Sequence, residues 1–410
     1  MIERVSDRRK SLVRTALLAA ATLAVALASG VSALVGVAQT ANPSLALRYV
    51  PDDAVALVAD NDARLLTEGE QRLASGSLAI VARRALRAQA INAGALRQLA
   101  TNAEYRGQSA AATRLLLLGE QVSRRDIGTQ LQLLEKQIAR DNVPGALVHY
   151  DRILRTNAAY QPLLFPKLDD ASSDTGVALN VVALLASAPP WLEAFLDWAI
   201  YDARAMGNLA TLLPAARGKA AAWTEARDAA LVRKFVDYGE FRGAFALYAS
   251  AVGGPASSAV VNGDFARTPR FPPIDWRTAD TADLEIELPA TETGGARYAT
   301  SADSSAKPLV QLLALRPGRY ALAARMAHNV GDSASVPRWT VTCVGDGGPV
   351  VGRLEAPPAT SEVTRSETFA IPDRDCTHQW LTLEIRATGR TGEQSGTIVW
   401  VRIAKLAARS

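Results

Sequence analysis

The side chains that could support metal binding or nucleophilic catalysis are few and far apart in this sequence. Its 410 residues include three histidines, His149, His328 and His378, and two cysteines, Cys343 and Cys376. Two cysteines cannot form a CxxC-type metal site, and the histidines are widely separated, so we expect no metal and no cofactor. GxSxG, HExxH, GxxxxGKS/T and GxGxxG motifs are absent from the sequence, and with them the common signatures of hydrolases and nucleotide-binding proteins.

Four acidic residues are the candidates for glycosidase chemistry, namely Asp264, Asp275, Glu285 and Glu287. A two-carboxylate mechanism requires a pair that projects into one cleft. Glu285 and Glu287 would share one face of a strand, as acids on exposed sheet faces routinely do. We therefore expect that the chain is not an enzyme.

Exposed aromatic rings are the usual platforms for binding a sugar, and the C-terminal part contains Trp276, Trp339, Trp380 and Trp400. The last three lie inside alternating apolar and polar runs, where large aromatic residues usually fill a core. Each of them can therefore be interpreted as a core residue or as a sugar platform.

The two cysteines flank strand-like runs, because Cys343 follows RWTVT and Cys376 precedes THQWL. In an oxidising compartment they would form a disulfide with a structural role. The alternative is two buried free thiols.

The chain changes character near residue 253. Beyond the linker GGPASSA, residues 253–259, short alternating runs such as ADLEIELPA, RYALAARMAH and GTIVWVRIAKL are separated by turn residues. This pattern predicts an antiparallel β-sandwich over residues 260–410. Before the linker, residues 44–252 are rich in Ala, Leu and Arg, which predicts an all-helical domain.

The helical part contains a degenerate internal repeat. Equivalent alanines recur at spacings of 33, 34, 32, 32 and 34 residues: Ala79, Ala112, Ala146, Ala178, Ala210 and Ala244. An aromatic residue follows four positions later in two units, as Tyr150 and Tyr248. This pattern resembles the tetratricopeptide repeat, with a period of about 34 residues. The alternative is an irregular helical bundle.

The resemblance implies a curved solenoid whose surface binds an extended peptide of a protein partner. Trp191 and Trp198 lie on an aromatic helix stripe, which indicates either core packing or a partner-binding patch. Together with Tyr150 and Tyr248, they are the candidate partner contacts.

The start of the predicted sandwich carries a second resemblance. Asn262-Gly263-Asp264-Phe265 followed by Trp276, and the later phrase LRPGRYALAARMA, are similar to carbohydrate-binding modules with a galactose-binding-like jelly roll. The resemblance implies a jelly roll with Trp276, Asp264 and Asn262 as candidate ligand contacts. The sequence differs from the family pattern at Ala266, where a glutamate is usual, and at Val401-Arg402, where a paired Asp is expected. Calcium binding is therefore not expected.

The N-terminus predicts the location of the protein. Residues 1–14 form a basic tail, and residues 15–38 contain no charge and are long enough to cross a bilayer. The positive-inside rule then predicts one transmembrane helix in the inner membrane, with the bulk of the chain in the periplasm. The alternative is a cleaved signal peptide, with Ala26 and Ala28 at the cleavage site, and a secreted protein.

Together these features predict a multidomain protein: one transmembrane helix, an all-α repeat domain and an all-β jelly roll. The Arg residues are dispersed among acidic ones and the net charge is only +4, so nucleic acid is not expected as a partner. We expect a non-catalytic, membrane-anchored cell-envelope scaffold that binds a protein partner and docks on protein or polysaccharide. This layout is similar to that of proteins in exopolysaccharide or envelope assembly. The alternatives are a carbohydrate-binding module on a helical stalk and a glycan-active enzyme.

Overall fold

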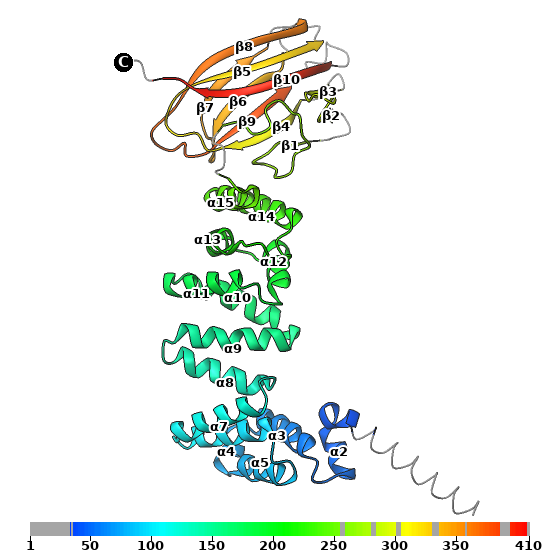
Figure 1. Cartoon of the computed structure of the whole chain (residues 1–410), viewed down its shortest axis with the longest axis vertical. Coiled ribbons are helices and arrows are strands. Elements are labelled where there is room, and N and C mark those ends of the chain that lie inside the picture. The colour runs from blue at the N-terminus through cyan, green and yellow to red at the C-terminus, as the bar shows by residue number, and fades with distance from the viewer. Residues whose placement is uncertain are drawn as a thin grey trace, which may run out of the picture. The chain divides into compact units, whose positions relative to one another are not determined.

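The structure is a computed structural model that describes residues 33, 36–254, 259–279, 284–300, 305–329, 336–356, 359–385 and 394–407. Helices occupy the first part of the chain and two antiparallel sheets the second, which confirms a multidomain α plus β organisation (Figure 1). The chain divides into two compact units, residues 1–161 and 162–410. This division falls inside the helical region, so the last helices belong to the same unit as the sheets.

The helical part begins with short elements and continues as helices of 10 to 15 residues. The helices are α2 (Pro43–Tyr49), α3 (Ala54–Glu68), α4 (Glu70–Ala74), α5 (Ser77–Ala88), α6 (Ala93–Tyr105), α7 (Ser109–Val122), α8 (Ile127–Ile138), α9 (Val143–Thr156), α10 (Gln161–Ala171), α11 (Thr175–Ala186), α12 (Leu192–Tyr201), α13 (Gly207–Ala216), α14 (Glu225–Asp237) and α15 (Phe241–Val252). Several of them begin after an Asn, Asp or Thr whose side chain accepts a bond from a free backbone N–H of the first turn, as Asp53 and Asp126 do.

The alanines of the sequence repeat lie on alternate helices. Ala79, Ala112, Ala146, Ala178, Ala210 and Ala244 fall on α5, α7, α9, α11, α13 and α15 respectively, and all but Ala178 are buried. Small residues at these positions let neighbouring helices approach closely: a Cβ added at Gly243 would lie 2.5 Å from the Cβ of Ala210. The repeat therefore corresponds to a regular packing position, whereas its assignment to the tetratricopeptide family remains a prediction.

The C-terminal part is a sandwich of two five-stranded antiparallel sheets. One sheet has the order β1-β4-β9-β6-β7, and the other has the order β2-β3-β10-β5-β8. The strands are β1 (Arg277–Thr278), β2 (Leu284–Glu287), β3 (Ala296–Thr300), β4 (Ala306–Leu313), β5 (Gly318–Asn329), β6 (Arg338–Cys343), β7 (Val350–Glu355), β8 (Ala359–Ile371), β9 (Gln379–Ile385) and β10 (Gln394–Lys405). Alternate residues of each sheet face a shared apolar core that includes Trp276, Trp339 and Leu322.

A disulfide joins Cys343, the last residue of β6, to Cys376, which precedes β9. This pairing confirms the disulfide expected from the sequence. Because β6 and β9 are neighbours, with Cys343 opposite Gln379, the bridge links two segments that already meet at one end of the sheet.

The expectation of a single-pass inner-membrane protein is corrected by the structure. Among the residues described, every helix is too short or too polar to traverse a bilayer. Most of the segment 15–38, on which that expectation rested, lies outside the described residues.

Candidate functional site

The tryptophan favoured as a ligand contact, Trp276, lies in the core of the sandwich. Its side chain is 1% exposed, and its ring lies 5.2 Å from that of Phe265 and 5.7 Å from that of Trp339. The indole Nε1 donates a hydrogen bond of 2.9 Å to the carbonyl oxygen of Asn262. The ring is therefore enclosed by protein and has no free face for a sugar.

The Asn-Gly-Asp phrase forms a tight turn that docks on β10. The Asn262 side chain is buried and bonds both the N–H and the carbonyl of Arg267, at 3.2 and 2.7 Å. The backbone N–H of Val401 donates to the Gly263 carbonyl at 2.7 Å, and a Cβ at Gly263 would collide with the Val401 carbonyl. Asp264 is exposed on this turn. These contacts of Asn262 and Gly263 indicate that the two residues stabilise the fold and do not contact a ligand.

The three remaining tryptophans of the sandwich lie in different environments. Trp339 is fully buried, whereas Trp380 and Trp400 are partly exposed. Trp380 lies on β9, and the guanidinium of Arg277 lies 5.7 Å from the centre of its ring. Trp400 lies on β10, the central strand of the second sheet.

A β-bulge turns Trp400 to the outer face of its sheet. The pairing of β10 with β5 shifts between Ile398 and Trp400, so that Trp400 pairs with Arg325. Ile398 and Val401 on either side are fully buried in the core. The extra residue of the bulge places the Trp400 ring away from the core, where a regular strand would have alternated differently.

Arginine side chains surround Trp400. The guanidinium of Arg402 stacks over the Trp400 ring at 4.8 Å from its centre. Cross-strand from Trp400, Arg325 forms an ion pair with Glu362 at 2.7 Å, and on β3 Arg297 pairs with Glu287 at 3.1 Å. We call this outer surface the Trp400 face; it comprises Arg297, Arg325, Asn329, Ser395, Thr397, Trp400 and Arg402.

A shallow cavity of about 250 Å³ lies at the strand ends of the Trp400 face. Its lining includes Arg297, Asn329, Ser395 and Thr397, whose amide, hydroxyl and guanidinium groups are hydrogen-bonding groups. His328 also contributes to the lining. His328 is 4% exposed, its ring nitrogens have no hydrogen-bond partner within the described part of the chain, and burial lowers its pKa. The cavity is polar and open to solvent, so it could bind one part of a ligand that extends beyond it.

The candidate partner contacts of the helical region are largely packing residues. Trp191 is 3% exposed, and the rings of Trp191 and Trp198 contact those of Phe165 and Phe195 at centroid distances of 5.4 to 6.1 Å. Tyr150 is 6% exposed, and burial raises the pKa of its hydroxyl.

Tyr248 is partly exposed on α15, and its ring meets that of Phe271 edge-on at 5.4 Å. Their burial and ring contacts thus favour the core interpretation for Trp191 and Tyr150, while Trp198 and Tyr248 retain part of their surface.

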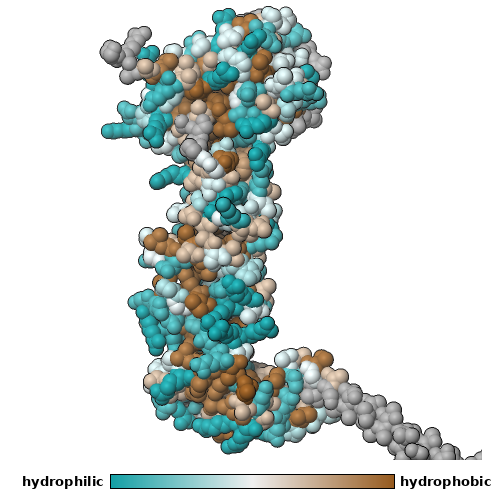
Figure 2. Space-filling model, viewed as in Figure 1, coloured by the Kyte–Doolittle hydropathy of each residue, from teal (hydrophilic) through white to brown (hydrophobic). Residues whose placement is uncertain are grey.

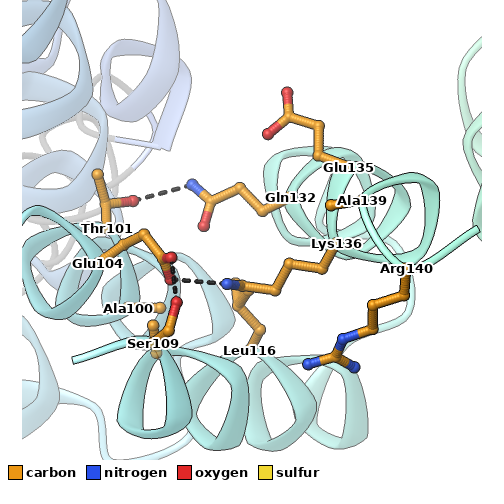
Figure 3. Close-up of a pocket in the computed structure, with 11 residues that line it drawn as sticks. Ala100, Thr101, Glu104, Ser109, Leu116, Gln132, Glu135, Lys136, Ala139 and Arg140 are labelled. Carbon is orange, nitrogen blue, oxygen red and sulfur yellow. Dashed lines mark hydrogen bonds and ion pairs between the residues drawn. The ribbon is translucent and has the colours of Figure 1, made fainter. Parts of the chain in front are cut away.

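A second concave surface lies in the first unit, between α6, α7 and α8 (Figure 3). It encloses about 500 Å³, with Ala100, Ala112 and Leu116 among its apolar lining residues. Lys136 of α8 forms an ion pair with Glu104 of α6 at 2.6 Å, and Gln132 donates to Thr101 at 2.8 Å.

The ion pair has an electrostatic consequence. The pKa of the Glu104 carboxyl is lowered, first by its hydrogen bond from Lys136 and then by that from Ser109. Glu104 is thus held charged on the wall of this groove. Elsewhere in the first unit, large apolar side chains such as Ile80 of α5 and Leu66 of α3 are exposed, and Figure 2 shows apolar surface on this part of the chain.

The acidic candidates do not assemble into a metal site. Among the described ranges, no group of three His, Cys, Asp or Glu side chains could hold a metal ion. Asp275 is buried, and its carboxylate accepts from the backbone N–H groups of Trp276 and Arg270 at 2.8 and 3.2 Å. Burial nevertheless raises its pKa.

Comparisons with known proteins concern the sandwich. No protein-family model and no curated protein matches the chain. Among solved structures, a CBM4 chain is 13% identical and covers 36% of this chain and 99% of its own, with a TM-score of 0.29. TmCBM61 in complex with β-1,4-galactotriose is 16% identical over 36% of this chain and 97% of its own (TM-score 0.25). The CBM6cm-2 carbohydrate-binding module of Cellvibrio mixtus lichenase 5A, with cellotriose, is 20% identical over 33% and 98% (TM-score 0.22).

Proposed function

We propose that this chain is a non-catalytic binding protein whose sandwich binds a saccharide on the Trp400 face. The observation that carries the proposal is the bulge that turns Trp400 out of the core and onto the middle of a sheet. A large aromatic ring at such a place gains less from packing than a core ring does, because part of its apolar surface stays in water. Binding of a sugar ring to that surface explains the arrangement.

The surroundings of Trp400 are suited to a flat, hydroxylated ligand. The outward residues of the neighbouring strand β5 include Ala321, Ala323 and Ala327. Their small side chains leave space for a ligand beside the Trp400 ring. Asn329, Ser395 and Thr397 add amide and hydroxyl groups at the end of the face. An apolar ring bordered by a few placed polar groups is the usual composition of a small-molecule site.

The acids on this face support the non-catalytic part of the proposal. Glu287 and Glu362 each face an arginine, with distances of 3.1 and 2.7 Å. A glycosidase needs two carboxyl groups that project together into one cleft. These two lie on β2 and β8, at opposite edges of the sheet.

The test is a glycan array probed with the full-length chain and two single variants. Trp400→Ala removes the ring from the proposed face, and Trp380→Ala removes a comparably exposed ring from the other sheet as a matched control. We expect saturable binding that is lost in Trp400→Ala and retained in Trp380→Ala. Absence of binding by the folded wild type, or equal loss in both variants, would refute the proposal.

The groove between α6, α7 and α8 supports a second function, the binding of a peptide from a protein partner. Its volume of about 500 Å³ and its mixed lining, with an apolar floor that includes Leu116 and with charged groups such as Glu135 and Arg140, suit a peptide that carries both apolar and charged side chains. Ala139→Trp would fill this groove from the exposed end of α8, and Ala88→Trp at the exposed end of α5 is the control. We expect peptides selected on the wild type to lose binding only to Ala139→Trp; if Ala88→Trp loses it equally, the groove is not the site.

A further inference from the structure

The central strand of the Trp400 face, β10, and its neighbour β5 carry cations and no anions. Their outward-facing cations are Arg319, Arg325 and Arg402, and neither strand contains an Asp or a Glu. The acids of this sheet lie on the outlying strands, as Glu287 on β2 and Glu362 on β8 do. The middle of the face therefore has a positive potential, which attracts anionic ligands.

Arg402 differs from the other arginines of the face in its partners. Arg325 and Arg297 each form an ion pair with a glutamate. None of the ion pairs or side-chain hydrogen bonds seen among the described residues involves Arg402, whose side chain is exposed. Its planar group instead lies over the Trp400 ring, 4.8 Å from the ring centre.

This stacking prepares the guanidinium for a ligand. A cation held over an aromatic ring is restrained at little cost to its hydrogen-bonding capacity, because the N–H groups point outward in the plane of the guanidinium. Such a group binds a carboxylate through two parallel hydrogen bonds. Since the Arg402 side chain is already restrained by the Trp400 ring, it loses less conformational entropy when the ligand binds.

We propose that Arg402 is the receptor for a carboxylate of an acidic, uronate-containing saccharide. This inference rests on the proposed saccharide function of the Trp400 face and specifies the class of ligand. The sugar carboxylate pairs with the guanidinium of Arg402, and the rest of the chain extends toward the polar cavity at Asn329 and Ser395. Arg325 contributes to the field while it remains paired with Glu362.

The experiment is calorimetric titration of the full-length chain with matched pairs of oligosaccharides. The probes are tri-uronates of galacturonic, glucuronic, mannuronic and guluronic acid, and the same trisaccharides with their carboxyl groups reduced to alcohols. The protein variants are Arg402→Gln and, as a control, Arg353→Gln. Arg353 is an exposed arginine of β7 in the other sheet, and it forms no ion pair with any residue that the structure describes.

We expect at least one uronate to bind more tightly than its reduced partner, with an affinity that falls as salt is added. Arg402→Gln should weaken that binding by about tenfold or more, because a charged hydrogen-bonding pair is lost. Arg353→Gln should leave it unchanged. A sulfated form of the reduced trisaccharide should bind less well than the uronate.

The outcomes separate the inference from the function on which it rests. Equal binding of the acidic and reduced members, lost in Trp400→Ala, would overturn the inference and leave saccharide binding intact. Equal weakening in Arg402→Gln and Arg353→Gln, or equal binding of the sulfated form, would also overturn it, since either result indicates a general charge effect. Binding to none of the trisaccharides would overturn it together with the proposed site.

Discussion

Removal of the Cys343–Cys376 bridge should destabilise the sandwich in an amount that can be worked out from the chain. The two cysteines are 33 residues apart in the sequence. The loop-entropy relation for a loop of that length gives about 3.7 kcal/mol of stabilisation, through the restriction of the unfolded chain. Both cysteines are at most 4% exposed, so the bridge is enclosed by the core.

The assay compares the urea unfolding of the oxidised wild type, the reduced wild type and the double variant Cys343→Ala/Cys376→Ala. The two forms without the bridge should agree with each other and should lose about 3 to 4 kcal/mol from the transition that carries the sandwich. The melting temperature of that transition should fall by roughly 7 to 15 °C. A loss below about 1 kcal/mol in both forms would refute the loop-entropy reasoning.

Three further predictions address single contacts. Gln379→Leu should cost about 1 to 3 kcal/mol, because the buried Gln379 amide satisfies both the N–H and the carbonyl of Leu315; chemical denaturation measures this, and an unchanged midpoint would contradict it. Gly243→Ala should destabilise the fold by about 1 to 3 kcal/mol, because the new Cβ would collide with Ala210. Gly119→Ala is the control and should be neutral or stabilising, because its Cβ would make ordinary contacts at 3.5 Å. Equal changes in melting temperature for the two variants would contradict this packing. Burial raises the pKa of Asp169 to about 6, from an ordinary value of 3.8. The protonated form is thus favoured in the fold, and its stabilisation is complete below about pH 3.8 and lost as the pH rises through about 6. Asp169→Asn should therefore gain about 1 to 3 kcal/mol at pH 7.5 and nothing at pH 3.5, and parallel pH profiles of melting temperature would contradict it.

The features that could be predicted from sequence are those with a regular period or a fixed chemistry. Alternation along runs such as the β5 sequence follows from a strand with one buried face, and β5 has that pattern. The recurring alanines identify positions where helices meet closely, as at Ala210. Two cysteines beside strand-like runs, together with an expected oxidising compartment, predicted the bridge that joins Cys343 to Cys376.

The candidate site could not be predicted in the same way, because it depends on interruptions of the period. The local sequence Val399-Trp400-Val401 does not show that an extra residue turns Trp400 outward. The bulge arises because Ile398 and Val401 are both buried in the core. Conversely, the Asn262 phrase resembles the start of carbohydrate-binding modules, while its contacts with Arg267 and Trp276 are those of a folding turn. The spacing of Trp400 and Arg402, two residues apart on one strand, is a local signal from which this contact could have been inferred.

The most direct test of the central claim is an NMR titration of the indole N–H signals with the saccharide that binds best. The chain has seven tryptophans, and the Trp400 signal can be assigned by its loss in Trp400→Phe. A saccharide on the Trp400 face should shift that signal in proportion to occupancy and leave those of the buried Trp276 and Trp339 in place. A shift confined to Trp380 or to the helical tryptophans, with Trp400 unchanged at saturation, would contradict the account.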